Sequence, residues 1–193
     1  LQPSTISGML DGFTHVHEID IDHSIYFIET LKKELGMSKD EMFEYGVDAG
    51  CGIGRTTSTL LKYCKNMDLN EPVLKHLRIA MTNNPGCCDM IHSTLQQFRP
   101  CYGRYDFVWI QWALQYLSDC EFVDLLIRIA KSFSTYRMGR SPVVCIKDNV
   151  DPHHDEVDTT DGSIIREEKT FMDIFRKANY KCILRMEQTF LPI

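Results

Sequence analysis

The stretch Tyr45-Gly-Val-Asp-Ala-Gly-Cys-Gly-Ile-Gly-Arg55 predicts the centre of the fold. Tyr45 to Asp48 is a short strand candidate that runs into a glycine loop, and Thr56 to Cys64 is predicted to follow as a helix. Glycines allow positive φ angles and let a ligand approach the backbone closely, while the start of a helix offers unpaired N–H groups. The loop therefore predicts a small-molecule site between a strand and a helix. The alternative is an ordinary glycine-rich turn.

The rest of the sequence alternates between helix and strand patterns. Apolar spacing predicts helices over 22–35, 119–133 and 167–178, and strands over 105–112, 142–146 and 181–190. Strands that alternate with helices indicate a mostly parallel sheet that is covered on both faces. We therefore expect a single α/β domain over 1–193, in which 1–36 forms an N-terminal cap and its helix adds a layer.

The composition excludes several classes of protein. The 193 residues include 21 Lys plus Arg and 27 Asp plus Glu, which gives a net charge of −6 and argues against nucleic acid as the main partner. No apolar run approaches the ~18 residues of a membrane span, and no signal peptide is visible. Eight cysteines without a CxxC pair indicate thiols in a reducing compartment rather than disulfides or a zinc site. We expect a monomeric, cytoplasmic or nuclear protein that holds no metal.

The glycine spacing G-x-G-x-G after Asp48 differs from the G-x-G-x-x-G of dinucleotide sites. It resembles the first motif of methyltransferases that use S-adenosylmethionine, which implies a Rossmann-like class I fold with a mostly parallel, seven-stranded sheet. Asp48 and the helix start suit the zwitterionic tail of that cofactor. Asp68 would end the second strand and bind both ribose hydroxyls, although a lone Asp in a loop is usually just solvated.

Four further segments carry a more specific resemblance. These are Gly8-Met-Leu10, Trp109-Ile-Gln-Trp112, Ile146-Lys-Asp-Asn149 and Asp155-Glu-Val-Asp158. In order, and with the glycine loop, they resemble the protein N-terminal α-amine methyltransferases, which act on chains that begin Xaa-Pro-Lys. The resemblance runs from Ser7 to Pro192. It implies S-adenosylmethionine as the cofactor and proteins with exposed Xaa-Pro-Lys N-termini as partners.

The resemblance also implies cofactor-binding residues. Matched by position, they are Gly50, Gly52, Arg55, Asp68, Leu69, Asn70, Leu95, Gln96 and Gln111. Leu95 and Gln96 would contact the adenine. Gln111 would lie at the carboxyl end of a strand, where open α/β sheets bind ligands, although it could simply be a polar cap on a buried strand.

The peptide-binding residues implied by the resemblance are Leu10, Val16, Trp112, Asn149, Asp155, Asp158 and Thr160. The Trp112 ring would contact the proline, Asp155 and Asp158 would hold the lysine, and Asn149 would orient the target amine. From composition alone, Trp112 could instead belong to the core. The six carboxylates between Asp148 and Asp161 could likewise be a solvated acidic loop.

The expected reaction requires the α-amine to lose a proton before it attacks a methyl group on positively charged sulfur. We expect Asp158 to act as the base or proton relay. Family members often have a histidine in a Gly-His-Leu context where this chain has Tyr116. A tyrosine, with a pKa of ~10, orients or relays at neutral pH, which argues against a histidine base here.

The resemblance also implies segments on both sides of this sequence. The family places an aromatic-rich segment before Leu1 and a last strand after Ile193, so the seventh strand is expected to be missing here. A small-molecule methyltransferase with the same sheet stays open, although the acidic stretch disfavours it. A non-catalytic binder of protein N-termini also stays open, because Tyr116 stands at the histidine position.

Overall fold

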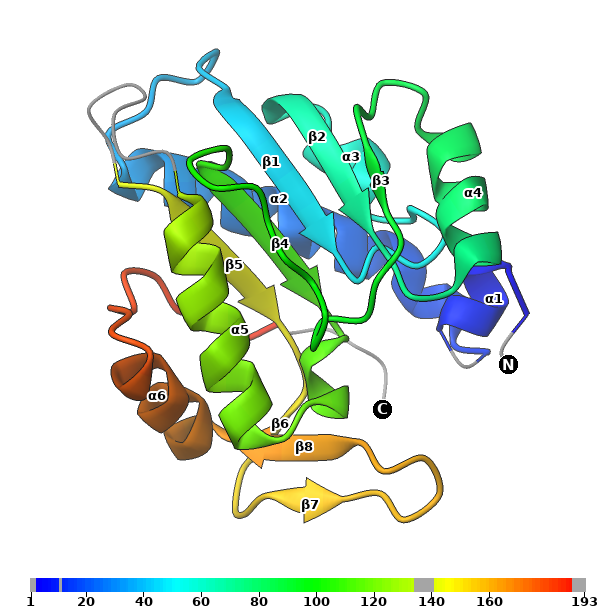
Figure 1. Ribbon diagram of the computed structural model, residues 1–193, viewed down its shortest axis with the longest axis vertical. Coiled ribbons are helices and arrows are strands. Elements are labelled where there is room, and N and C mark those ends of the chain that lie inside the picture. Colours follow the sequence, from blue (N-terminus) through cyan, green and yellow to red (C-terminus); the bar gives the residue numbers. More distant parts are fainter. Residues whose placement is uncertain (1–2, 11, 134–140, 189–193) are drawn as a thin grey trace.

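A central sheet of five parallel strands forms the middle of the protein (Figure 1). The computed structural model describes residues 3–10, 12–133 and 141–188. The strands are β1 (Phe43–Ala49), β2 (Cys64–Asn70), β3 (Met90–Ile91), β4 (Phe107–Gln111) and β5 (Val143–Lys147), in the spatial order β3-β2-β1-β4-β5. The prediction of a mostly parallel sheet is confirmed.

Helices cover both faces of this sheet, as predicted. On one face, α2 (His17–Glu34), α3 (Thr57–Leu60) and α4 (Leu74–Asn83) pack against the strands through residues such as Ile28, Leu60 and Leu77. On the other face, α5 (Asp119–Ser132) and α6 (Glu168–Lys177) form a second cluster with the strands. Figure 1 shows α2 behind the sheet and α5 in front of it. The predicted helix over 22–35 is therefore the added layer that α2 forms.

The predicted strand over 181–190 is wrong where the structure describes it. Lys181–Gln188 has no strand pairing, and positions 189 and 190 lie outside the described residues. Within the described ranges, the outer edge of β5 has no neighbouring strand. The segment also leaves apolar side chains such as Ile183 and Met186 exposed, so little burial favours an ordered strand. The described sheet has five strands, whereas the seven-stranded sheet of the resemblance without its last strand would have six.

The helix predicted over Thr56 to Cys64 is also shorter than expected. Only Thr57–Leu60 is helical, because the Tyr63 carbonyl already accepts the Phe43 N–H at 2.8 Å and Cys64 begins β2. The early start of β2 leaves space for one helical turn. It also places Asp68 inside a strand rather than in a loop.

A second, small sheet follows β5 and contains much of the acidic stretch. It consists of β6 (Val150–Asp151), β7 (Glu156–Val157) and β8 (Ile164–Glu167), in the order β6-β8-β7. Figure 1 shows it beyond the end of β5. The short helix η2 (Leu114–Tyr116) follows β4, and α1 (Ile6–Met9) and η1 (Thr14–Val16) precede α2. Part of the acidic stretch therefore lies in the strands β6 and β7.

Candidate cofactor and peptide site

The glycine loop bends sharply at the end of β1. Gly50 has a φ of 84° and Gly52 a φ of 56°, values that side-chain-bearing residues rarely adopt. A Cβ atom on Gly50 would lie 2.6 Å from the Ala113 Cβ, and one on Gly52 would lie 3.0 Å from the Met9 Sδ. The Gly50 N–H donates to the Asn70 carbonyl at 2.9 Å. The loop therefore needs glycine on steric grounds, and it lies between the ends of β2 and β4.

Asp48, near the end of β1, connects the glycine loop to α3. It is buried, and one carboxylate oxygen accepts the Thr57 hydroxyl at 2.6 Å. Burial raises the pKa of Asp48 to about 6, although the Thr57 hydrogen bond and the Arg55 charge act in the opposite direction. Asp48 thus fixes the loop to the single turn of α3.

Glu71 lies directly after β2 and was missed by the sequence reasoning. Its Oε2 accepts the Gly52 N–H at 3.1 Å, and its Oε1 accepts the Val73 N–H at 2.9 Å. Only 7% of the residue is exposed. An acid that immediately follows a strand next to a glycine loop was the available signal, but the polar sequence of β2 obscured where the strand ends.

Asp68, which was predicted at this position, lies three residues earlier and has other partners. Its carboxylate accepts the hydroxyls of Tyr105 at 2.7 Å and Tyr45 at 3.1 Å, and it pairs with Arg104 at 3.2 Å. Both Asp68 and the adjacent Leu69 are fully buried. The structure therefore brings Glu71, and not Asp68 or Leu69, to the glycine loop.

A buried network joins Arg55 and Gln111 to helix α2. Arg55 Nη1 donates to Asp20 Oδ2 at 2.7 Å, and Gln111 Nε2 lies 3.0 Å from both Asp20 oxygens. Lys147 forms an ion pair with the same carboxylate and donates to the Ser24 hydroxyl at 2.9 Å. Burial alone would raise the pKa of Asp20, but the Lys147 and Arg55 charges outweigh it and hold the pKa below its usual range.

Asp20 and Lys147 were also missed by the sequence reasoning. The signal was the helical stripe of Asp20, Ser24 and Ile28, which are four residues apart and all buried. A charged residue on a buried stripe needs a partner of opposite charge. The network brings together the predicted residues Arg55 and Gln111.

The predicted adenine contacts lie beyond the end of β2. The Asn70 amide donates to the Ser93 carbonyl at 2.9 Å, while its Oδ1 is buried and has no partner among the described residues. Leu95 is buried, and Gln96 Nε2 donates to the Tyr116 carbonyl at 3.2 Å. Asn70 therefore ends β2, whereas Leu95 and Gln96 lie on the segment that connects β3 to β4.

The two tryptophans have different environments. Trp109 is 1% exposed and belongs to the core, whereas Trp112 is half-buried at the end of β4. Trp112 has a φ of 51°, and its backbone N–H donates to the Lys147 carbonyl at 2.9 Å. The Arg55 guanidinium carbon lies 5.3 Å from the centre of its ring. Trp112 is thus beside the buried network and not in the core.

Tyr116 and the acidic β7–β8 hairpin face each other. The Tyr116 hydroxyl donates to Asp161 Oδ2 at 3.4 Å, and half of its surface is exposed. Asp158 lies in the same hairpin turn, and its Oδ1 accepts the Thr160 N–H at 2.7 Å. Asp158 and Thr160 are both exposed. The predicted residues Tyr116, Asp158 and Thr160 are therefore neighbours in one acidic surface region.

Arg166 of β8 holds this hairpin against η2. Its side chain is buried, pairs with Asp119 at 2.9 Å and donates to the carbonyls of Leu114 and Leu117. These carbonyls flank Tyr116 on either side. The hairpin and the Tyr116 turn therefore form a connected unit.

Asp155, directly before β7, bonds to the far end of the hairpin, where β8 meets α6. Its two oxygens accept the Glu167 N–H at 2.7 Å and the Thr170 hydroxyl at 3.0 Å, which stabilises the start of α6. Asn149 is exposed directly after β5, where its neighbour Asp148 is more enclosed. Burial raises the pKa of Asp148 to about 6.

The predicted N-terminal contacts lie near the glycine loop. Leu10 is buried and follows α1, whose Met9 lies against Gly52. Val16 is half-buried and ends η1, directly before α2. Both residues therefore lie on the segment that covers this end of the sheet.

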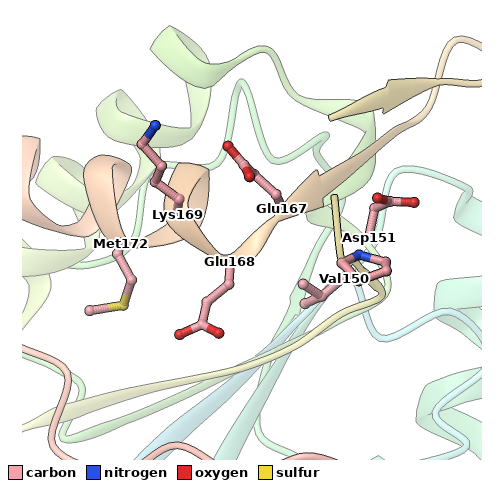
Figure 2. A pocket seen from close by; sticks show the side chains of 7 residues that line it. Val150, Asp151, Glu167, Glu168, Lys169 and Met172 are labelled. Carbon is pink, nitrogen blue, oxygen red and sulfur yellow. The ribbon is translucent and has the colours of Figure 1, made fainter. Parts of the chain in front are cut away.

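An open pocket of about 510 Å³ lies apart from these residues, between β6 and the start of α6 (Figure 2). Its lining residues are Val150, Asp151, Pro152, Glu167, Glu168, Lys169 and Met172. None of the predicted site residues lines it. Across the described ranges, no group of three or more His, Cys, Asp and Glu side chains is arranged to hold a metal ion. In the same part of the chain, no helix combines the length and apolar composition of a membrane span.

Comparison with known proteins identifies the family. A family model described as "AdoMet dependent proline di-methyltransferase" matches residues 2–193. The chain belongs to this methyltransferase family. The family's cofactor is S-adenosylmethionine, in agreement with the sequence resemblance.

Individual relatives of this methyltransferase agree with the assignment. It is 34% identical to the alpha N-terminal protein methyltransferase 1 of Caenorhabditis elegans, over 97% of this chain and 79% of the relative. It is 33% identical to the N-terminal Xaa-Pro-Lys N-methyltransferase 1 of Xenopus tropicalis, over 91% and 76%. A solved SAM-dependent methyltransferase from Leishmania major superposes with a TM-score of 0.85 at 27% identity, over 98% of this chain and 73% of that one. The methyltransferase fold is therefore confirmed.

The residues around the loop fit S-adenosylmethionine. Gly50 and Gly52 allow the sharp turn of the loop, and Glu71 provides a carboxylate that can accept two ribose hydroxyls. Arg55 provides a cation for the amino-acid carboxylate, and the unpartnered Asn70 Oδ1 provides a buried acceptor. These donors and acceptors match the polar groups of that cofactor.

Proposed function

We propose that this methyltransferase transfers methyl groups from S-adenosylmethionine to the free α-amine of proteins that begin Xaa-Pro-Lys. The observation that carries the proposal is the half-buried Trp112 ring at the end of β4, whose centre lies 5.3 Å from the Arg55 guanidinium carbon and which precedes Tyr116 of the acidic region by four residues. An aromatic face, a cofactor loop and an acidic hairpin suit a proline ring, a methyl donor and a lysine ammonium. The names of the relatives support the same substrate.

For the cofactor half, we assign Glu71 to the ribose hydroxyls and Arg55 to the carboxylate. Gln111 lies at the carboxyl end of β4, held by Asp20. Leu95 and Gln96 border the adenine. When bound, S-adenosylmethionine supplies a methyl group on positively charged sulfur. The contacts of Asp68 favour Glu71 over Asp68 for the ribose, because Asp68 is fully buried among two tyrosines and an arginine.

For the peptide half, the Trp112 ring packs on the proline and the exposed Asp158 receives the lysine and the amine proton. An α-amine has a pKa of ~8, so its deprotonation at neutral pH costs only about 1 kcal/mol. Asp158 accepts this proton directly or through a water molecule, while Asn149 orients the amine. The Tyr116 hydroxyl, which contacts Asp161, extends the hydrogen-bonded path across the hairpin. Asp155 bonds to the end of β8 and to the first turn of α6, and so supports the hairpin.

We also propose that the enzyme acts as a monomer in the cytoplasm or nucleus. All eight cysteines are free, including four buried ones, which supports a reducing compartment. The net charge of −6 would attract basic protein N-termini.

The decisive experiment is a methylation assay with labelled S-adenosylmethionine and peptides that begin Ser-Pro-Lys, acetyl-Ser-Pro-Lys and Ser-Pro-Gln. We expect label in the first peptide, none in the acetylated one and little in the third. Equal labelling of the acetylated peptide would refute the proposal, because its nitrogen cannot accept a methyl group. In the same assay, Asp158→Asn should reduce kcat about 100-fold or more. The control is Asp124→Asn, an exposed acid on α5.

A further inference from the structure

Asp20 of helix α2 bonds to three side chains at the carboxyl end of the central sheet. It is fully buried and bonds to Arg55 after the glycine loop, Gln111 at the end of β4 and Lys147 at the end of β5. These residues are 35, 91 and 127 positions away in the sequence, respectively. A single carboxylate therefore connects the N-terminal helix to both halves of the site.

Asp20 supplies the one negative charge that is bonded to two cations in this network. Arg55 and Lys147 both carry a positive charge, and Asp20 bonds to both. If the Asp20 charge is removed, two cations stay in an enclosed region without their bonded counter-charge. A further positive group, such as a sulfonium, would then bind less favourably beside them.

We propose that Asp20 is a positioning residue that holds Arg55 against Trp112 and offsets the Arg55 and Lys147 charges, so that a positively charged sulfonium ligand can bind next to them. This inference rests on the proposed function, because the sulfonium is that of S-adenosylmethionine. It adds a residue of the N-terminal helix to the cofactor site and assigns Lys147 a role in its charge balance.

The charge of the ligand gives a direct test. S-adenosylmethionine carries a positive sulfur, whereas S-adenosylhomocysteine has a neutral one and is otherwise the same apart from the methyl group. Loss of the Asp20 charge should therefore weaken the binding of S-adenosylmethionine more than that of S-adenosylhomocysteine. If the substitution only disturbed the packing of α2, the binding of both ligands would weaken equally. The ratio of the two dissociation constants separates these two effects.

The experiment is isothermal titration calorimetry with both ligands on the full chain, with folding checked by circular dichroism. We expect Asp20→Asn to reduce the preference for S-adenosylmethionine over S-adenosylhomocysteine about tenfold. Asp20→Glu, which retains the charge, should keep most of the preference. Asp22→Asn removes the same charge from an exposed position on the same helix and is the matched control.

Lys147→Met provides an independent arm should Asp20→Asn fail to fold. Removing this cation should shift the preference toward S-adenosylmethionine, and combining it with Asp20→Asn should restore the wild-type ratio. An unchanged ratio in Lys147→Met, or in a folded Asp20→Asn, overturns the inference. Absence of binding of either ligand to the wild-type chain would instead refute the proposed function.

Discussion

Two buried acids, Asp20 and Asp68, have similar surroundings but lie at different places along the sheet. Both are fully buried, and each pairs with an arginine, Arg55 at 2.7 Å and Arg104 at 3.2 Å. The partners of Asp20 lie at or beyond the carboxyl ends of strands. Those of Asp68 include Tyr45, near the start of β1.

The difference shows that residue type alone does not indicate a binding site. Open α/β sheets bind ligands at the carboxyl ends of their strands, because the loops there leave backbone and side chains accessible. Asp20 and Glu71 lie at that end, whereas Asp68 stabilises the opposite half of the sheet. The end of the sheet at which the partners of an acid lie therefore separates the two roles. The variants below test this separation.

The largest expected effect is on stability. Asp68→Asn removes the charged acceptor of the Tyr105 and Tyr45 hydroxyls and one of the two carboxylates that pair with Arg104, and should reduce the free energy of unfolding by about 3 kcal/mol. Urea denaturation measures this change. The matched variant is Asp89→Asn, which removes the exposed partner of the same arginine, 2.6 Å away. It should cost less than about 1 kcal/mol. If both variants cost the same, burial does not distinguish the two carboxylates.

The next effect is on cofactor affinity. Glu71→Gln replaces the proposed ribose acceptor by a neutral side chain and should raise the Kd for S-adenosylhomocysteine about 10- to 100-fold. Calorimetry measures it, and Glu18→Gln, an exposed acid on α2, is the control. S-adenosylhomocysteine is the better ligand for this test because it has no sulfonium charge. The loss of affinity then reports the ribose contact. If folded Asp68→Asn protein binds S-adenosylhomocysteine more weakly while Glu71→Gln does not, then Asp68 and not Glu71 is the ribose ligand.

The sequence predicts the strongly patterned elements of this fold well. The predicted helices over 119–133 and 167–178 match α5 and α6 to within one residue, because each has a continuous apolar stripe. The helix predicted over 22–35 matches α2 at its end, but α2 begins five residues earlier, at His17. The sequence 105–112 likewise predicts β4, which is rich in aromatic and β-branched residues. Local pattern is sufficient where one face of an element is uniformly apolar.

The failures come from long-range pairing. Helix α3 ends early because the Tyr63 carbonyl already bonds to β1 and β2 begins at the next residue. Residues 181–188 have no described neighbour with which to form a strand. The strand β2 reads Cys-Lys-Asn-Met-Asp-Leu-Asn, so its alternation does not show where it ends. Asp68 was therefore assigned to a position that Glu71 occupies in space. In the peptide half, Asp155 was grouped with Asp158 by resemblance, although its hydrogen bonds join it to α6.

The smallest expected effect concerns a third buried acid at the carboxyl end, Asp48, whose pKa shifts in the opposite direction to that of Asp20. Burial raises the pKa of Asp48 to about 6, so its contribution to stability is present at low pH and is lost as the pH rises through about 6. Wild type should therefore lose about 1 kcal/mol relative to Asp48→Asn between pH 5 and pH 7. The lowered pKa of Asp20 keeps it ionised throughout this range, so it adds no slope. Urea denaturation at both pH values measures the difference, and Asp148 cancels because both proteins contain it. An equal slope in the two proteins would mean that Asp48 is not desolvated, and the glycine loop would then be more open to water than its contacts indicate.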